Sequence, residues 1–156
     1  MDKDDILKEL ESGYEKAVKE FGVKASLDEL DKAFAVRDGV LQHGFPAVNI
    51  LGQVSSCIID SFSRWNGYFH GTIMPNPHDL VSANESKFLS EDEKKEVLKM
   101  MSRVMVLVSK RSLAVAKKDD SVHADFIDES LEFWNNELQP FIVSVMGKVH
   151  EGWKVK

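Results

Sequence analysis

The histidines are the first residues to consider, because an imidazole can bind metal ions and transfer protons near neutral pH. The chain has five: His43, His70, His78, His123 and His150. No two of them are three or four residues apart, the spacing that places two ligands on one face of a helix. Neither a His-Glu-x-x-His nor a Glu-x-x-His motif occurs. The sequence therefore predicts no metal site.

Three of these histidines lie beside features that suggest a local role. His70 and His78 flank a segment rich in proline, where a histidine is usually a polar loop residue, although the two side chains could also converge in space. His123 follows Asp119 and Asp120 at the expected start of a helix. We interpret it as a capping-region histidine with acidic neighbours.

Arg64 is followed six residues later by His70. This spacing resembles the Arg-x(4 to 6)-His motif of HEPN-type ribonucleases, which are small all-helical proteins that often act as dimers. The resemblance implies that the histidine acts as a general acid or base and that the arginine holds a phosphate. Arg37 and His43 show the same spacing, so the motif does not single out one pair. The candidate catalytic residues are Arg64, His70 and His78.

Asp60 and Arg64 form a second pattern, because residues four apart on a helix are neighbours. Their apolar surroundings suggest a buried ion pair, but the helical projection places both on a polar face with Gln53 and Ser56. We expect a solvated pair that contributes a few tenths of a kcal/mol. The functional alternative is that this polar strip lines a groove or a subunit interface.

The sequence gives little support for a catalytic nucleophile or for a nucleotide-binding site. Cys57 has no histidine near it in sequence and is interpreted as a small packed hydrophobe. Neither a G-x-G-x-x-G motif nor a Walker motif occurs. We expect no cofactor.

Apolar residues recur every three or four positions along the chain, which predicts helices. Ser26 with Glu29 forms a capping-box pattern, Ser90 with Glu93 begins another helix, and Pro140 is expected to kink or divide the last one. The predicted fold is all-α, a single domain over 1–156. It is a bundle of four long helices plus a shorter fifth element, with antiparallel neighbours and a proline-containing loop at about 71–79. The predicted helices span 4–21, 27–41, 46–65, 91–118 and 121–149, with a short turn near 80–88.

The composition of the chain limits its expected partners and its expected location in the cell. The 26 acidic and 20 basic residues give a net charge of -6, which disfavours nucleic acid as a partner. A single cysteine cannot form an intramolecular disulfide, and a cytoplasmic location is expected. No signal core and no apolar run near the roughly 20 residues of a membrane span is present, so we expect no membrane association.

The two longest predicted helices would each extend for about 40 Å, whereas a compact chain of this length has a radius of gyration of about 15 Å. Apolar residues also cover more than one side of the helix at 91–118. We therefore expect a non-enzymatic interaction or regulatory module that forms a homodimer through its long helices or binds a protein partner. The alternatives are a HEPN-like metal-independent ribonuclease and a bundle with an internal apolar ligand pocket, lined by Met101, Met105 and Trp134.

Overall fold

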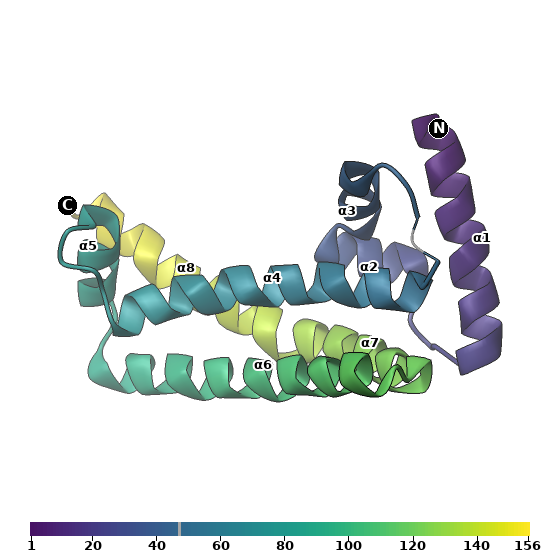
Figure 1. The fold of residues 1–156 in the computed structure, drawn as a ribbon. Helices are drawn as coiled ribbons and strands as arrows, with labels where there is room; N and C mark the ends of the chain where they lie inside the picture. The colour runs from purple at the N-terminus through teal and green to yellow at the C-terminus, as the bar shows by residue number, and fades with distance from the viewer. Residues whose placement is uncertain (47) are drawn as a thin grey trace. The chain divides into compact units, whose positions relative to one another are not determined.

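The computed structural model describes residues 1–46 and 48–156 (Figure 1). Within these residues it contains α-helices, one π-helical segment and no strand, which confirms the all-α fold class. The chain forms two compact units. The first unit consists of Met1–Ser61 with Leu107–Glu132, and the second consists of Phe62–Val106 with Phe133–Lys156. The single domain over 1–156 stays a prediction.

The first unit begins with three helices, α1 (Lys3–Phe21), α2 (Leu27–Phe34) and α3 (Val36–His43). Helix α1 ends at Gly22, whose φ of 71° suits a residue without a side chain. The predicted capping box at the start of α2 is confirmed: the Glu29 N–H donates to Ser26 Oγ at 3.1 Å, and the Ser26 N–H donates to Glu29 Oε2 at 2.9 Å. These two bonds satisfy backbone donors that the first turn leaves open.

One continuous helix over 27–41 was a wrong prediction, because the backbone breaks at Ala35. This residue adopts the left-handed conformation, with φ 52° and ψ 47°. Phe34 and Val36 on either side are 4% and 0% exposed. An unbroken helix would point two such residues about 200° apart, so the break lets both side chains reach the core.

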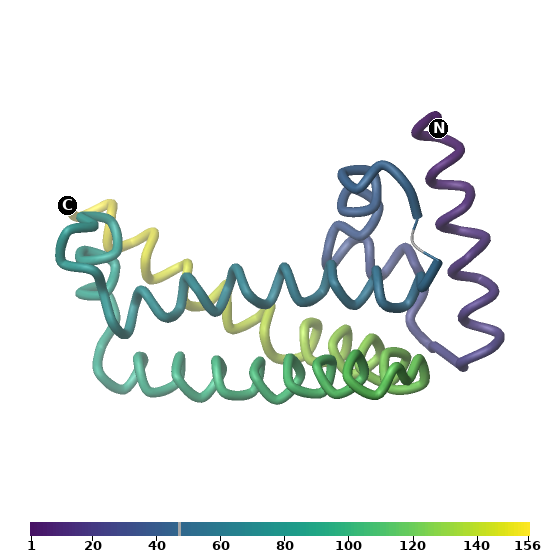
Figure 2. Tube along the Cα trace, in the orientation of Figure 1, coloured from purple at the N-terminus to yellow at the C-terminus, as the bar shows by residue number. Residues whose placement is uncertain are grey.

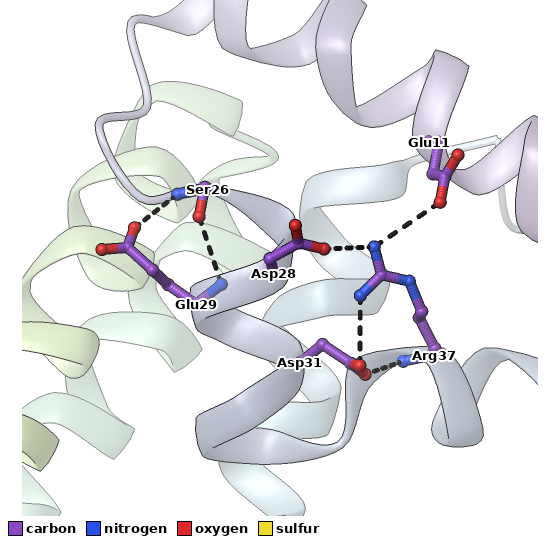
Figure 3. A network of polar contacts seen from close by, with 6 residues as sticks. All are labelled: Glu11, Ser26, Asp28, Glu29, Asp31 and Arg37. Carbon is purple, nitrogen blue, oxygen red and sulfur yellow. Dashed lines mark hydrogen bonds and ion pairs between the residues drawn. The ribbon is translucent and has the colours of Figure 1, made fainter.

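Arg37 stabilises the region around this break (Figure 3). Its guanidinium donates to Asp28 at 2.6 Å and to Asp31 at 3.1 Å, and it lies 3.5 Å from Glu11. The Arg37 backbone N–H also donates to Asp31 Oδ1 at 2.8 Å. These contacts connect α1, α2 and α3 and occupy the guanidinium with carboxylates.

The rest of the first unit comes from residues 50–61 of α4 (Ile50–Ile73), residues 107–117 of α6 (Glu91–Lys117), and residues 120–132 of α7 (Asp120–Phe133). The α7 side chain of Asp128 accepts the backbone N–H groups of Lys24, at 3.0 Å, and Ala25, at 2.9 Å. The Tyr14 hydroxyl donates to the Ala25 carbonyl at 2.6 Å. The turn after α1 is therefore held from both α1 and α7. The core contains Leu51, Val54, Ile58, Leu107, Ala114 and Ile127.

The second unit contains the remainder of α4 and α6, with α5 (Leu80–Phe88), the π-helical segment Trp134–Leu138 and α8 (Gln139–Lys154). Helix α4 is unbroken to Ile73 (Figure 2), eight residues beyond the predicted end at 65, so the predicted loop at 71–79 begins only at residue 74. Phe69 explains this extension, because it is 0% exposed and lies two turns after the equally buried Phe62.

The last predicted helix is divided near Pro140, as the sequence indicated. Pro140 lies in the first turn of α8, and the π-helical segment directly precedes it. A proline removes one backbone donor and clashes with the carbonyl four residues earlier, and the wider π-helical turn accommodates both effects.

Candidate functional site

The first unit contains an open cavity of about 700 Å³ between the end of α3 and the helices α4, α6 and α7. Its size is typical of a small-molecule site. Phe45, Ala114 and Val115 contribute apolar lining, and most of the other lining residues are polar. The lining residues are His43, Phe45, Asn49, Gly52, Gln53, Ser56, Arg111, Ala114, Val115, Lys118, Asp120 and His123.

Asn49 fixes the edge of the cavity where α4 begins. Its Oδ1 accepts the Gly52 N–H at 2.9 Å, and its Nδ2 donates to Asp120 Oδ1 of α7 at 3.2 Å. A Cβ at Gly52 would lie 2.9 Å from Asn49 Nδ2, so a larger residue at this position would displace the Asn49 side chain. Gln53 adds a third contact, because its Nε2 donates to the Phe45 carbonyl at 3.3 Å.

His123 lies in the wall of the cavity and is 4% exposed. Its Nδ1 is 3.1 Å from Ser55 Oγ of α4, and its Nε2 has no hydrogen-bond partner among the residues that the structure describes. Burial lowers the pKa of this imidazole, Arg111 lowers it further, and Asp120 and Asp119 oppose the shift. The ring is therefore neutral at pH 7.

A serine beside a histidine suggests nucleophilic catalysis, but the exposure of this pair favours a structural role. Ser55 is 0% exposed, so a substrate carbonyl cannot reach its hydroxyl. The bond to Ser55 instead fixes the orientation of the His123 ring.

Arg111 is the cation whose charge lowers the pKa of this histidine. Its Nη2 donates to Ser56 Oγ at 2.8 Å, and its Nε is buried and has no acceptor among the described residues. In the described part of the chain no carboxylate lies within ion-pair distance of Arg111, whereas Arg37 pairs with three acidic residues and Arg103 pairs with Glu137. Arg111 is thus a partly buried cation whose only protein partner among these residues is a neutral hydroxyl.

The candidate catalytic residues lie elsewhere, in the second unit. Arg64, His70 and His78 are all exposed, and within residues 1–46 and 48–156 none of their side chains has a hydrogen bond or ion pair. Arg64 and His70 share α4, but six residues rotate a helix by about 240°, so the two side chains leave different faces. The solvated pair between Asp60 and Arg64 is not found among the described residues. The ribonuclease function of Arg64 and His70 stays a prediction.

Other sequence features are occupied by protein contacts. Arg37 of the second Arg-x(5)-His match is bound to carboxylates, as described above. Lys110 is paired with Glu129. Met105 is 52% exposed and does not line an enclosed apolar pocket.

The sequence leaves a groove open as an alternative for part of this cavity and does not indicate the rest. Gln53 and Ser56 belong to the polar strip for which a groove was the functional alternative, and both line the cavity. His123 was interpreted only as a capping-region residue. Arg111 lies on the same helical face as Leu107, four residues before it, and Ala114, three residues after it. This apolar spacing is the sequence signal that could have identified Arg111, and both apolar residues are buried in the structure.

Comparison with family models, with curated proteins and with solved structures yields no match for this chain. No group of three or more histidine, cysteine, aspartate or glutamate side chains within the described residues is arranged to hold a metal ion. In the same residues, none of the helices has the length and apolarity needed to cross a bilayer. The function has to be inferred from the residues of this chain.

Proposed function

We propose that the chain is a non-enzymatic helical interaction module that associates with a second copy through the exposed face of α6. The observation that supports this is a row of exposed apolar side chains. Leu98, Met105 and Val106 in the second unit are 54%, 52% and 68% exposed, and Leu113 in the first unit is 54% exposed. Exposed apolar surface of this kind commonly marks an interaction site.

The row belongs to an uncharged stripe, which we call the α6 stripe. At about 100° per residue, eight residues between 98 and 116 fall within an arc of about 120°. All eight are exposed, and none is charged. The hydroxyls of Ser102 and Ser112 donate to carbonyls of α6 itself, at 3.0 and 3.1 Å, which reduces their need for water. The α6 stripe comprises Leu98, Ser102, Met105, Val106, Ser109, Ser112, Leu113 and Ala116.

A second copy is the occupant that fits this stripe best. The chain carries a net charge of -6, so two copies repel each other wherever carboxylates face one another. The stripe offers a face without charges along about 28 Å of helix. Its small residues, Ser109, Ser112 and Ala116, allow two helix axes to approach closely.

The expected affinity is low. Burial of a half-exposed leucine, methionine or valine gains about 1 kcal/mol, so four such residues on each of two copies give a gross gain of about 8 kcal/mol. Association costs about 4 kcal/mol or more in lost freedom. The balance of about 4 kcal/mol or less predicts a dimer that dissociates at about 1 mM or above.

The test is the molar mass by light scattering and sedimentation, measured up to about 1 mM chain. We expect the average mass of wild type to rise steadily above one chain mass as the concentration increases, and that of Met105→Glu to remain at one. Val143→Glu is the matched control, because Val143 is also exposed, at 60%, but lies on α8. A wild-type chain that keeps the mass of one copy at every concentration, or a Met105→Glu variant that dimerises like wild type, would refute the proposal.

The proposal includes a cytoplasmic setting. Cys57 is a buried free thiol and the single cysteine of the chain, so the fold needs no oxidising compartment.

A different protein as the partner of the α6 stripe is the competing outcome. It would leave the wild-type mass at one copy.

A further inference from the structure

We infer that the cavity beside Arg111 binds a small organic monocarboxylate, with the carboxylate at Arg111 and an apolar body against Phe45 and Val115. This inference is independent of the α6 stripe. It rests on the charge, the hydrogen-bond donors and the lining of the cavity.

The positive charge of Arg111 has no carboxylate partner among the described residues. Arg111 is partly buried, and among the described residues its side chain makes one hydrogen bond, to Ser56. Removing a cation from water without a counterion is unfavourable, and protein structures usually supply a carboxylate. Here the described residues supply none, which leaves the position open to an anion from solution. A guanidinium suits a carboxylate because its donors lie in one plane and can form two parallel bonds.

The charged side chains that line the cavity have a net positive charge. Arg111 and Lys118 carry two positive charges, and Asp120 carries one negative charge. The remainder is a single positive charge within a chain whose total is -6. A monoanion balances this lining, whereas a phosphate dianion would leave excess negative charge beside Asp120.

His123 can supply a neutral hydrogen-bond donor in the lining of the cavity. The bond from Ser55 fixes His123, and Nε2 of the neutral ring has no partner among the described residues. In the tautomer in which Ser55 donates to Nδ1, Nε2 carries the proton and can donate to an anionic ligand. Because the imidazole stays neutral, it adds this donor without adding a second full charge near Arg111.

Part of the cavity lining is apolar. Phe45, Ala114 and Val115 line the cavity, and Phe45 is 62% exposed. An apolar group attached to the carboxylate would cover part of this aromatic surface, which inorganic anions cannot do. The volume of about 700 Å³ admits a ligand with an aromatic ring and a short alkyl chain.

The test uses 4-phenylbutyrate as the probe and its neutral amide as the matched ligand control, added to the full chain and followed by NMR chemical shifts. A probe of this size is expected to bind with a dissociation constant of about 1 mM. Saturable shifts at residues of the cavity with the carboxylate, and at least tenfold weaker binding of the amide, are the expected result. Inorganic phosphate is expected to bind more weakly than the probe.

Variants connect this binding to the charge. Arg111→Gln should weaken probe binding about tenfold or more, whereas Arg64→Gln makes the same charge change on an exposed arginine of the second unit and should leave it unchanged. Lys118→Asn gives a second measurement if Arg111→Gln does not fold. Asparagine tolerates the backbone φ of 51° at this position, and the variant should weaken binding about two- to fivefold.

Three results would overturn the inference. The first is the absence of a saturable shift with the probe up to about 20 mM. The second is equal binding of the carboxylate and the amide. The third is tighter binding of phosphate, which would assign the cavity to a different class of ligand.

Discussion

Two glycines of α8 should respond in opposite ways to replacement by alanine. At Gly152, a Cβ would lie 2.5 and 2.7 Å from Phe88 Cδ2 and Cδ1, and closer still to Cγ. At Gly147, a Cβ would have no atom within 4 Å. Both positions have ordinary helical backbone, so the two substitutions differ only in the space around the new methyl group.

The Phe88 ring cannot easily move away from Gly152. It packs edge to face on Trp153, with the ring centroids 5.3 Å apart at an angle of 82°. Trp153 Nε1 in turn donates to Glu85 Oε1 at 2.9 Å, and Tyr68 donates to the other oxygen of Glu85 at 2.8 Å. Displacing the ring would therefore disturb a connected set of contacts between α4, α5 and α8.

Replacing a helical glycine by alanine gains about 0.8 kcal/mol through helix propensity. Forcing a methyl group into a filled site costs about 1 to 3 kcal/mol. Gly147→Ala should therefore raise the free energy of unfolding by about 0.8 kcal/mol, and Gly152→Ala should lower it by about 1 kcal/mol.

The assay is urea unfolding of both variants and wild type, followed by circular dichroism and tryptophan fluorescence. The difference between the variants is the informative quantity, because helix propensity contributes equally to both. If Gly152→Ala is as stable as Gly147→Ala, the packing of Phe88 on α8 is not as described.

Two further predictions concern the first unit. Asp128→Ala should lower the free energy of unfolding by about 2 to 3 kcal/mol, because two backbone N–H groups lose a charged acceptor, whereas exposed Asp125→Ala on the same helix should change it little; equal urea midpoints would contradict this. For His123, burial lowers the pKa in the folded state below the value of about 6.5 in the unfolded state. Its contribution to stability is thus present above about pH 6.5 and is lost as the pH falls below that value. Unfolding measured from about pH 8 to 5 should show a shallower acid decline for His123→Gln than for wild type, and identical slopes would count against a buried neutral imidazole.

The sequence predicted those elements whose signals are local. The capping box of Ser26 and Glu29 lies within one helical turn, so both bonds follow from residues three apart. The division at Pro140 follows from the covalent structure of proline. Such features depend little on the rest of the fold.

The missed elements depend on contacts distant in sequence. The break at Ala35 exists because Phe34 and Val36 are both buried, and a helical pattern alone cannot show that the core lies on both sides. The extension of α4 beyond residue 65 depends on the burial of Phe69, which outweighs the low helix propensity of the glycines at 67 and 71.

The cavity shows the same limit. His123 and Ser55 are 68 residues apart, so no spacing rule connects them. Arg103, Lys110 and Arg111 are all cations of α6, but Arg103 forms an ion pair with Glu137 and Lys110 with Glu129. Only the structure separates the unpaired arginine from the paired cations.

The two proposals make use of opposite faces of α6. Arg111 and Ala114 lie about 140° to 200° from the centre of the α6 stripe, since each residue advances the helix by about 100°. A second copy on the stripe would therefore leave the cavity face of α6 uncovered. Arg111→Gln should lower probe binding without changing the molar mass, and Met105→Glu should abolish the dimer without changing probe binding. A variant that altered both properties would show that the two faces are coupled, which neither proposal alone explains.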